Sequence, residues 1–184
     1  SMNLTSTNPV FGFNALGGAA AIELKNGFTY QGTSADVSGG SFGRVTGVAQ
    51  YGKAWGDWAL YVGASPSHED GWRDNSPSRT DKIYTDVGFD NGHKSLHLSL
   101  NYANNSLNGT GPSPYALLNK DWGAAVDFPG RFDNTLTMAT LRGTLELSKA
   151  TSLQGNAYFR DFHQDYINGT IFQAQACTSG TTSN

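Results

Sequence analysis

Polar and apolar residues alternate with a period of two along most of the chain, a pattern typical of β-strands. The clearest run is Lys94–Asn104, where Leu96, Leu98, Leu100 and Tyr102 alternate with Ser95, His97, Ser99 and Asn101. One face of this strand is wholly apolar and the other polar. We therefore expect the two faces to meet different surroundings.

Seven strands are predicted, each bounded by turn-forming residues such as glycine, asparagine and proline. Their ranges are Thr33–Ser41, Arg44–Lys53, Trp58–Gly71, Thr80–Asp90, Lys94–Asn104, Thr135–Lys149 and Ser152–Asn168. Ala54–Asp57 predicts a tight turn, and Asn91-Gly92 is the strongest hairpin signal in the chain. The fifth and sixth strands should place six leucines on the same side of one antiparallel sheet: Leu96, Leu98, Leu100, Leu141, Leu145 and Leu147.

The predicted connections are short at one end of the strands and mostly long at the other. Short turns cover residues 54–57, 91–94 and 149–152, whereas longer loops cover 72–79, 105–134 and the chain from 169 onward. In Asn105–Asn134 the alternation is lost and glycine and proline gather, so we expect a loop excursion with at most one short helix, Pro114–Trp122. This asymmetry favours a membrane β-barrel, since alternation alone also fits a soluble sandwich.

The stretch Asn8–Lys25 begins with an Asn-Pro turn and continues into a glycine- and alanine-rich run and a short strand-like segment, Ala20–Leu24. It resembles the end of the plug domain of TonB-dependent outer-membrane receptors. The positions that carry this resemblance are Asn8, Pro9, Gly12, Ala15, Gly17, Gly18, Ile22 and Lys25. By its residues alone, the stretch would be a loop followed by an edge strand.

Four further segments resemble early barrel segments of the same family: Ser38–Arg44, Glu69–Ser76, Asn108–Pro114 and Gly155–Asn168. The resemblance implies an all-β fold, with the antiparallel up-and-down strands of a transmembrane β-barrel preceded by the end of a plug domain. Residues 1–2 would be a cloning remnant, 3–28 the end of the plug, and 29–184 the first seven or so strands with their extracellular loops. That is about a third of a barrel of roughly 22 strands.

The resemblance also implies a function: the parent receptor takes up a scarce ligand, most often a ferric siderophore, with energy delivered by TonB. The implied partners are TonB, through an N-terminal part of the parent, the siderophore or other small ligand, and outer-membrane lipid. A transporter of this kind needs no cofactor and no catalytic residues. We weigh against it a soluble all-β binding module, such as a carbohydrate-binding domain.

Composition supports a strand-rich chain and narrows the classes of partner. Of 184 residues, 23 are glycine and only 15% are charged, against roughly 25% in typical soluble domains. No run approaches the ~18 apolar residues of a membrane-spanning helix. The net charge of −3 argues against a general nucleic-acid binder. The single cysteine, Cys177, is either a free thiol or half of a disulfide with a partner beyond Asn184.

Aromatic and arginine side chains in the predicted extracellular loops are the candidates for ligand binding. The leading candidates are Trp72, Arg73, Tyr115, Trp122 and Arg131, accompanied by Phe128 and Phe132. Such groups suit a flat, anionic chelate, because they offer ring faces and a planar cation. Loop packing or an aromatic girdle at the membrane interface explains the same residues equally well.

Two clusters of acidic and histidine residues are candidates for metal binding. Asp161, His163 and Asp165 share one strand face, but a solvated strand end is the favoured interpretation. In His68-Glu69-Asp70 the side chains of an extended strand alternate between the two faces, so they cannot converge on one metal ion. There is no G-x-S-x-G motif and no convergent acid–base set, so we expect no enzyme activity.

The edges of the predicted sheet raise a separate expectation. Seven strands cannot close a barrel around a plug, so the first and seventh would expose unpaired backbone groups. We expect such a piece either to curl so that the plug-like segment packs on one face, or to associate with further copies through its edges.

Overall fold

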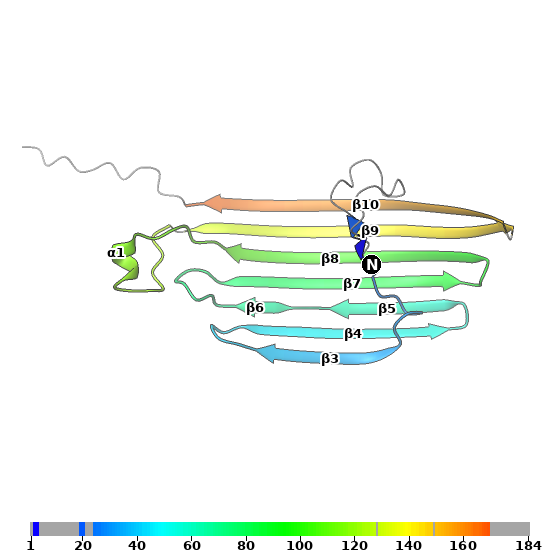
Figure 1. Ribbon diagram of the computed structural model, residues 1–184, viewed down its shortest axis with the longest axis horizontal. Helices are drawn as coiled ribbons and strands as arrows, with labels where there is room; N and C mark the ends of the chain where they lie inside the picture. The colour runs from blue at the N-terminus through cyan, green and yellow to red at the C-terminus, as the bar shows by residue number, and fades with distance from the viewer. Residues whose placement is uncertain (1, 4–18, 21–23, 128, 149, 170–184) are drawn as a thin grey trace, which may run out of the picture.

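The computed structural model describes residues 2–3, 19–20, 24–127, 129–148 and 150–169, and places most of them in one antiparallel sheet (Figure 1). Its strands are β3 Gly32–Gly39, β4 Val45–Trp55, β5 Trp58–Ala64, β6 Ser67–Glu69, β7 Ser78–Asp90, β8 Lys94–Asn108, β9 Gly130–Ser148 and β10 Thr151–Asn168. A second pair joins β1, Met2–Asn3, to β2, Ala19–Ala20, and the one described helix is α1, Tyr115–Leu118. The predicted all-β class is confirmed.

The strands follow one another across the sheet in chain order, β10-β9-β8-β7-β5-β4-β3, as an up-and-down meander. The prediction of one unbroken strand over Trp58–Gly71 is wrong, because the chain divides it into β5 and β6 at Ser65-Pro66. Proline has no N–H to donate to a ladder. The neighbouring strands bridge the gap: Gly47 N–H donates to the Pro66 carbonyl at 2.9 Å, and Ser65 N–H donates to the Lys82 carbonyl at 2.8 Å.

The connections differ in length at the two ends of the sheet, as predicted. Residues 56–57 and 91–93 make short turns at one end, where two residues also separate Ser148 of β9 from Thr151 of β10. Residues 40–44, 70–77 and the 21 residues between β8 and β9 make the longer connections at the other end (Figure 1), and the predicted loop beyond 169 lies outside the described residues. The predicted excursion Asn105–Asn134 is too long, since β8 continues to Asn108 and β9 begins at Gly130. The predicted helix Pro114–Trp122 is also shorter, and spans Tyr115–Leu118.

Strand register assigns the side chains to two faces of the sheet. Leu98 lies opposite Val87 of β7 and Leu141 of β9, and Lys94 lies opposite Leu145. Directly opposed residues share a face, so all six leucines of the prediction lie on one side, which we call the apolar face. Five of them are 43–62% exposed: Leu96, Leu98, Leu100, Leu141 and Leu147.

The apolar residues form a band that crosses the strands obliquely. On β10 the continuous apolar run ends at Phe159. Following the directly opposed residues from strand to strand, a row across the sheet leads from Phe159 to Tyr51 on β4. On β4, however, apolar and glycine positions of this face continue past Tyr51 to Val45. Beyond the band on the loop side, the same face turns polar and charged, with Arg79, Asp81, Asp133, His163 and Asp165.

The opposite side, the polar face, holds most of the buried residues. Ala59, Tyr61, Asp86 and Ser99 are buried there, and the remaining buried apolar side chain in the described residues, Ala124, lies in the loops. A segment from the N-terminal side covers them (Figure 1). The described part of the chain contains no helix with the length and hydrophobicity of a membrane span.

The β7–β8 hairpin offers a test of the fold. Gly92 has a φ of +83°, and a Cβ there would meet no atom within 4 Å. Gly92→Val should therefore act through backbone strain alone and lower the free energy of unfolding by roughly 1–2 kcal/mol. Urea titration measures it, with Gly92→Asn as the control, because asparagine tolerates this conformation. Equal losses in both variants would contradict the assigned turn.

Candidate functional site

A short segment lies on the polar face ahead of β3; we call residues 24–30 the strap. Its turn is closed by its own side chains, since Asn26 Oδ1 accepts hydrogen bonds from the N–H groups of Phe28 and Thr29, both at 2.9 Å. Thr29 Oγ1 in turn accepts from Asn26 N–H at 3.1 Å. This reciprocal capping gives the turn a fixed shape before it meets the sheet.

The strap sits in a seat made by small residues. Gly27 lies directly on the backbone of Leu60, where a Cβ would come within 2.5 Å of the carbonyl oxygen. Phe28 occupies the space above Gly88, and its ring meets His97 edge-on with centroids 6.1 Å apart. At the far end, the Tyr30 carbonyl lies where a Cβ on Gly52 would project. Larger side chains at these glycines would lift the strap off the sheet.

Gln50 of β4 ties the strap to two further strands. Its Oε1 accepts hydrogen bonds from Lys25 Nζ at 3.0 Å and from the Tyr61 hydroxyl at 2.8 Å. Its Nε2 donates to Ser34 Oγ of β3 at 2.8 Å. One glutamine thus joins the strap to β3, β4 and β5, with Lys25 also lying 4.7 Å above the Tyr30 ring.

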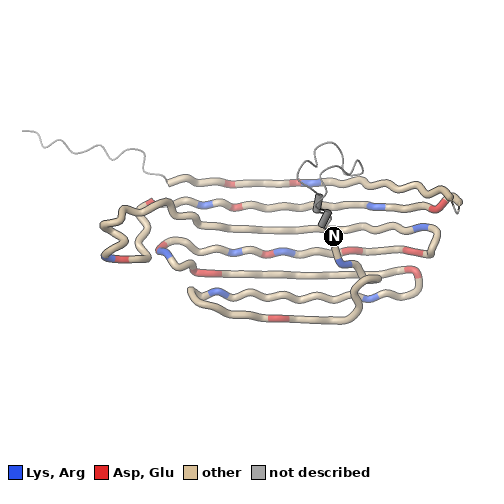
Figure 2. Tube along the Cα trace, in the orientation of Figure 1, with Lys and Arg blue, Asp and Glu red and all other residues tan. Residues whose placement is uncertain are grey.

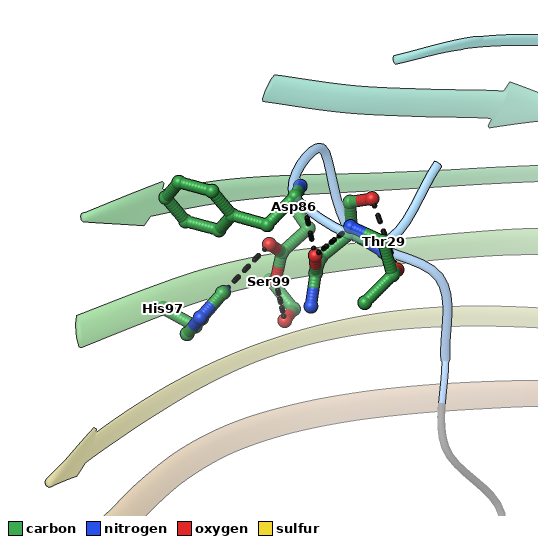
Figure 3. Close-up of polar contacts among 6 residues, drawn as sticks. Thr29, Asp86, His97 and Ser99 are labelled. Atoms are coloured by element: carbon green, nitrogen blue, oxygen red, sulfur yellow. Dashed lines mark hydrogen bonds and ion pairs between the residues drawn. The ribbon is translucent and has the colours of Figure 1, made fainter. Parts of the chain in front are cut away.

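Next to His97, whose ring Phe28 meets, a fully buried carboxylate joins β7 to β8 (Figure 3). Asp86 Oδ1 lies 2.8 Å from His97 Nδ1, and Asp86 Oδ2 accepts a hydrogen bond from Ser99 Oγ at 2.8 Å. A nucleophilic serine would need the histidine between itself and the carboxylate. Here serine and histidine each contact the aspartate directly, so the cluster gives both oxygens of a buried side chain a hydrogen-bonding partner, and the histidine does not lie between the serine and the carboxyl group.

An open cavity of about 470 Å³ lies between the strap and strands β8–β10. Its polar lining includes His97, Arg142, Gln154, Asn156 and Thr29. Arg142 is exposed and lies on the same face as Asp86. The cavity therefore offers a cation and several amides beside the strap, on the side opposite the apolar band.

Arg73, a predicted ligand-binding residue, holds two loops together. Its guanidinium donates to the Gly111 carbonyl at 2.9 Å, the Ala124 carbonyl at 3.0 Å and Ser113 Oγ at 2.6 Å. These partners all belong to the β8–β9 excursion, whereas Arg73 belongs to the β6–β7 loop. Most of its hydrogen-bonding capacity is thus used within the protein.

The three aromatic candidates remain accessible at the same end of the sheet. Trp72 is 50% exposed, Trp122 74% and Tyr115 79%. Arg131 instead lies on β9 and forms an ion pair with Asp133, apart from the aromatic rings. The hydroxyl of Ser106, and after it Arg131, hold the pKa of Asp133 below its usual value, in a part of β9 outside the apolar band. The structure thus leaves three rings accessible, although the Arg73 guanidinium lies 5.6 Å from the centroid of the Trp72 ring, and it pairs both arginines within the protein.

The other candidates fall into three groups. Phe132 stacks on Tyr166 of β10 with centroids 4.5 Å apart, and Phe128 lies outside the described residues. His68 pairs with Asp70 at 3.0 Å and His163 with Asp165 at 3.2 Å, and the described residues contain no group of three such side chains placed to hold a metal ion.

Of the plug-like positions, Lys25 is described, whereas Asn8–Gly18, Ile22 and also Cys177 lie outside the described residues.

Comparison of the chain with protein-family models, with curated proteins and with solved structures finds no match. Any hypothesis about function therefore depends on the chain's own residues and their geometry.

Sequence reasoning missed the buried cluster under the strap. A signal was present: the Asn91-Gly92 hairpin sets the register that brings Asp86 opposite Ser99 and Gly88 opposite His97. Alternation alone marked these positions as the polar face and gave no sign that a distant segment would bury them.

Replacing the buried carboxylate tests the cluster. Asp86→Ala should lower the free energy of unfolding by roughly 1–3 kcal/mol, because Ser99 and His97 lose a buried acceptor. Asp36→Ala, an exposed change on the same face of β3, should alter it by less than about 0.5 kcal/mol. Denaturant titration of both variants measures the difference. Equal effects would contradict the hydrogen bonds that Asp86 makes to His97 and Ser99.

Changing the shape of the Arg73 cation tests the loop junction. Arg73→Lys keeps the charge but loses the planar fork, so hydrogen exchange in residues 109–127 should speed up by about tenfold. Arg131→Lys is the matched control, since its exposed ion pair contributes little. Unchanged protection in Arg73→Lys would contradict the junction.

Proposed function

We propose that this chain is the early barrel part of a TonB-dependent outer-membrane receptor, which takes up a scarce ligand such as a ferric siderophore. The observation that carries the proposal is the contrast between the two faces of one sheet. One face is an apolar band that no described element covers, and the other is polar and already carries the strap, residues 24–30. In such a receptor these faces would meet lipid and the plugged lumen.

The size and slope of the band support a membrane role. On β9 it runs from Thr137 to Leu147, about 34 Å along the strand, which corresponds to roughly 25 Å of height at a 45° tilt. Between β10 and β4 the loop-side boundary of the band moves along the strands by about six residues, or about 20 Å. These strands are five spacings apart, about 24 Å across the sheet, so the boundary implies a strand tilt of about 40°. Membrane barrels have bands about 25 Å tall and strands tilted by about 35–45°.

The strap supports the plug assignment. Lys25, the last position of the plug-like motif, contacts the polar face through Gln50, and the strap's glycine and aromatic residues fill notches in the same face. A segment that links a plug to the first barrel strand must lie against the lumen wall in this way. The longer connections would then be extracellular, where Trp72, Tyr115 and Trp122 would face arriving ligand.

A soluble binding module receives less support. A sandwich covers its apolar face with a second sheet, whereas most leucines of this band stay 43–62% exposed and no described element lies over them. The aspartate cluster and the loop junction serve structure, so we propose transport rather than catalysis.

A cysteine scan along β8 tests the proposal in lipid vesicles. In a Cys177→Ser background, Leu98→Cys and Leu100→Cys are labelled with the environment-sensitive fluorophore NBD, as are Ser95→Cys and Asn101→Cys. We expect blue-shifted emission, quenched by nitroxide lipids, at 98 and 100 only, because these positions face lipid.

Circular dichroism provides the control for folding in every variant. Emission that does not alternate between the two sets, in chains with the sheet intact, would overturn the membrane assignment. A folded chain that stays out of the vesicles, with every label in water, would favour the soluble module.

A further inference from the structure

An apolar groove of about 730 Å³ runs across β8, β9 and β10 on the apolar face. At its floor Gly143 and Gly155 are directly opposed in the sheet, so two adjacent strands lack side chains at the same level. Leucine side chains form its walls: Leu96, Leu141, Leu145 and Leu153. On this face of the described sheet, Gly47 of β4 lies opposite Val37, whereas Gly143 and Gly155 leave two neighbouring strands without a side chain at one level.

A single cation stands at one end of the groove. Lys94 lines it on the side of the short turns and faces the same way as Leu145 and Leu153. It is exposed, and Figure 2 shows a basic position at the short-turn end of β8. The Trp58 and Phe89 rings, 5.1 Å apart, occupy the adjoining row, at the edge of the band.

We propose that this groove binds one phospholipid, with an acyl chain along the Gly143–Gly155 floor and the anionic phosphate on Lys94. The inference rests on the proposed function, because it takes the apolar face to meet lipid. An apolar groove with a cation at its short-turn end suits a phospholipid, because its acyl chains are apolar and its phosphate is anionic. Aromatic rings and lysines at a band edge lie at headgroup depth.

The structure supplies a matched control for the charge. Lys53 of β4 also faces the apolar side near the short-turn boundary, since it lies opposite Leu60, but it does not line the groove. General attraction to an anionic surface would involve both lysines alike. A built site requires Lys94 alone.

Native mass spectrometry of the whole chain in detergent micelles measures the site, with dioleoylphosphatidylglycerol and uncharged dioleoylglycerol as probes. Lys94→Gln should lower phosphatidylglycerol occupancy by about fivefold and leave dioleoylglycerol unchanged. Lys53→Gln should change neither. Equal losses from the two lysine variants, or no loss from Lys94→Gln, would overturn the site.

Filling the floor tests the acyl chain. A Cβ at Gly155 would meet no atom within 4 Å, so Gly155→Leu should fill the groove without clash and lower binding of both probes. Gly155→Ala should have an intermediate effect, and Ala35→Leu, on the same face at β3, should have none. Undiminished binding in Gly155→Leu would overturn the inference.

The NBD label at position 98 separates the two proposals. A chain whose label is in lipid but whose variants bind both probes normally loses only the phospholipid site. A chain whose label remains in water loses the membrane assignment, and this inference with it.

Discussion

Backbone hydrogen bonds between neighbouring strands hold this molecule together, because a single-layer sheet has almost no core of its own. The described part of the chain buries few apolar side chains, and the ladders run instead through residues whose side chains stay exposed. Register therefore decides every other property. A slip of one residue in the β7–β8 ladder would move the leucines of β8 to the polar face, or else Asp86 to the apolar one.

Most of this sheet could be predicted from the sequence, since period-two alternation marks the strands wherever one face is apolar. The failures occur where alternation carries no hydrophobic signal. Asn105–Asn108 pairs with Arg131–Asn134, but only one apolar residue of each segment, Leu107 and Phe132, interrupts the polar positions. One such residue per strand sets no alternation, so the pattern indicates a loop. Pro66 separates β5 from β6, but both stay between β4 and β7, because those two strands supply hydrogen bonds on either side of the gap.

The candidate site was less predictable than the sheet. Composition placed Arg73 and the aromatic residues in loops, but the destination of a guanidinium depends on carbonyls about 40–50 residues away, which no local pattern reveals. The strap's seat depends likewise on empty space above Gly52 and Gly88, and a missing side chain resembles an ordinary strand glycine in the sequence. The resemblance to receptors supplied the functional proposal, and the contrast between the faces supports it independently.

The position of the strap also constrains the order in which the chain assembles. The strap precedes β3 in the chain, yet its seat is built from β4, β5, β7 and β8, with Phe28 meeting a histidine about 70 residues later. Each hairpin can form from its own neighbours, whereas the seat exists only once three hairpins have paired. The strap is thus synthesised before every strand that builds its seat, yet it can dock only after those strands have paired, and the part of the polar face beneath it stays open to water until then.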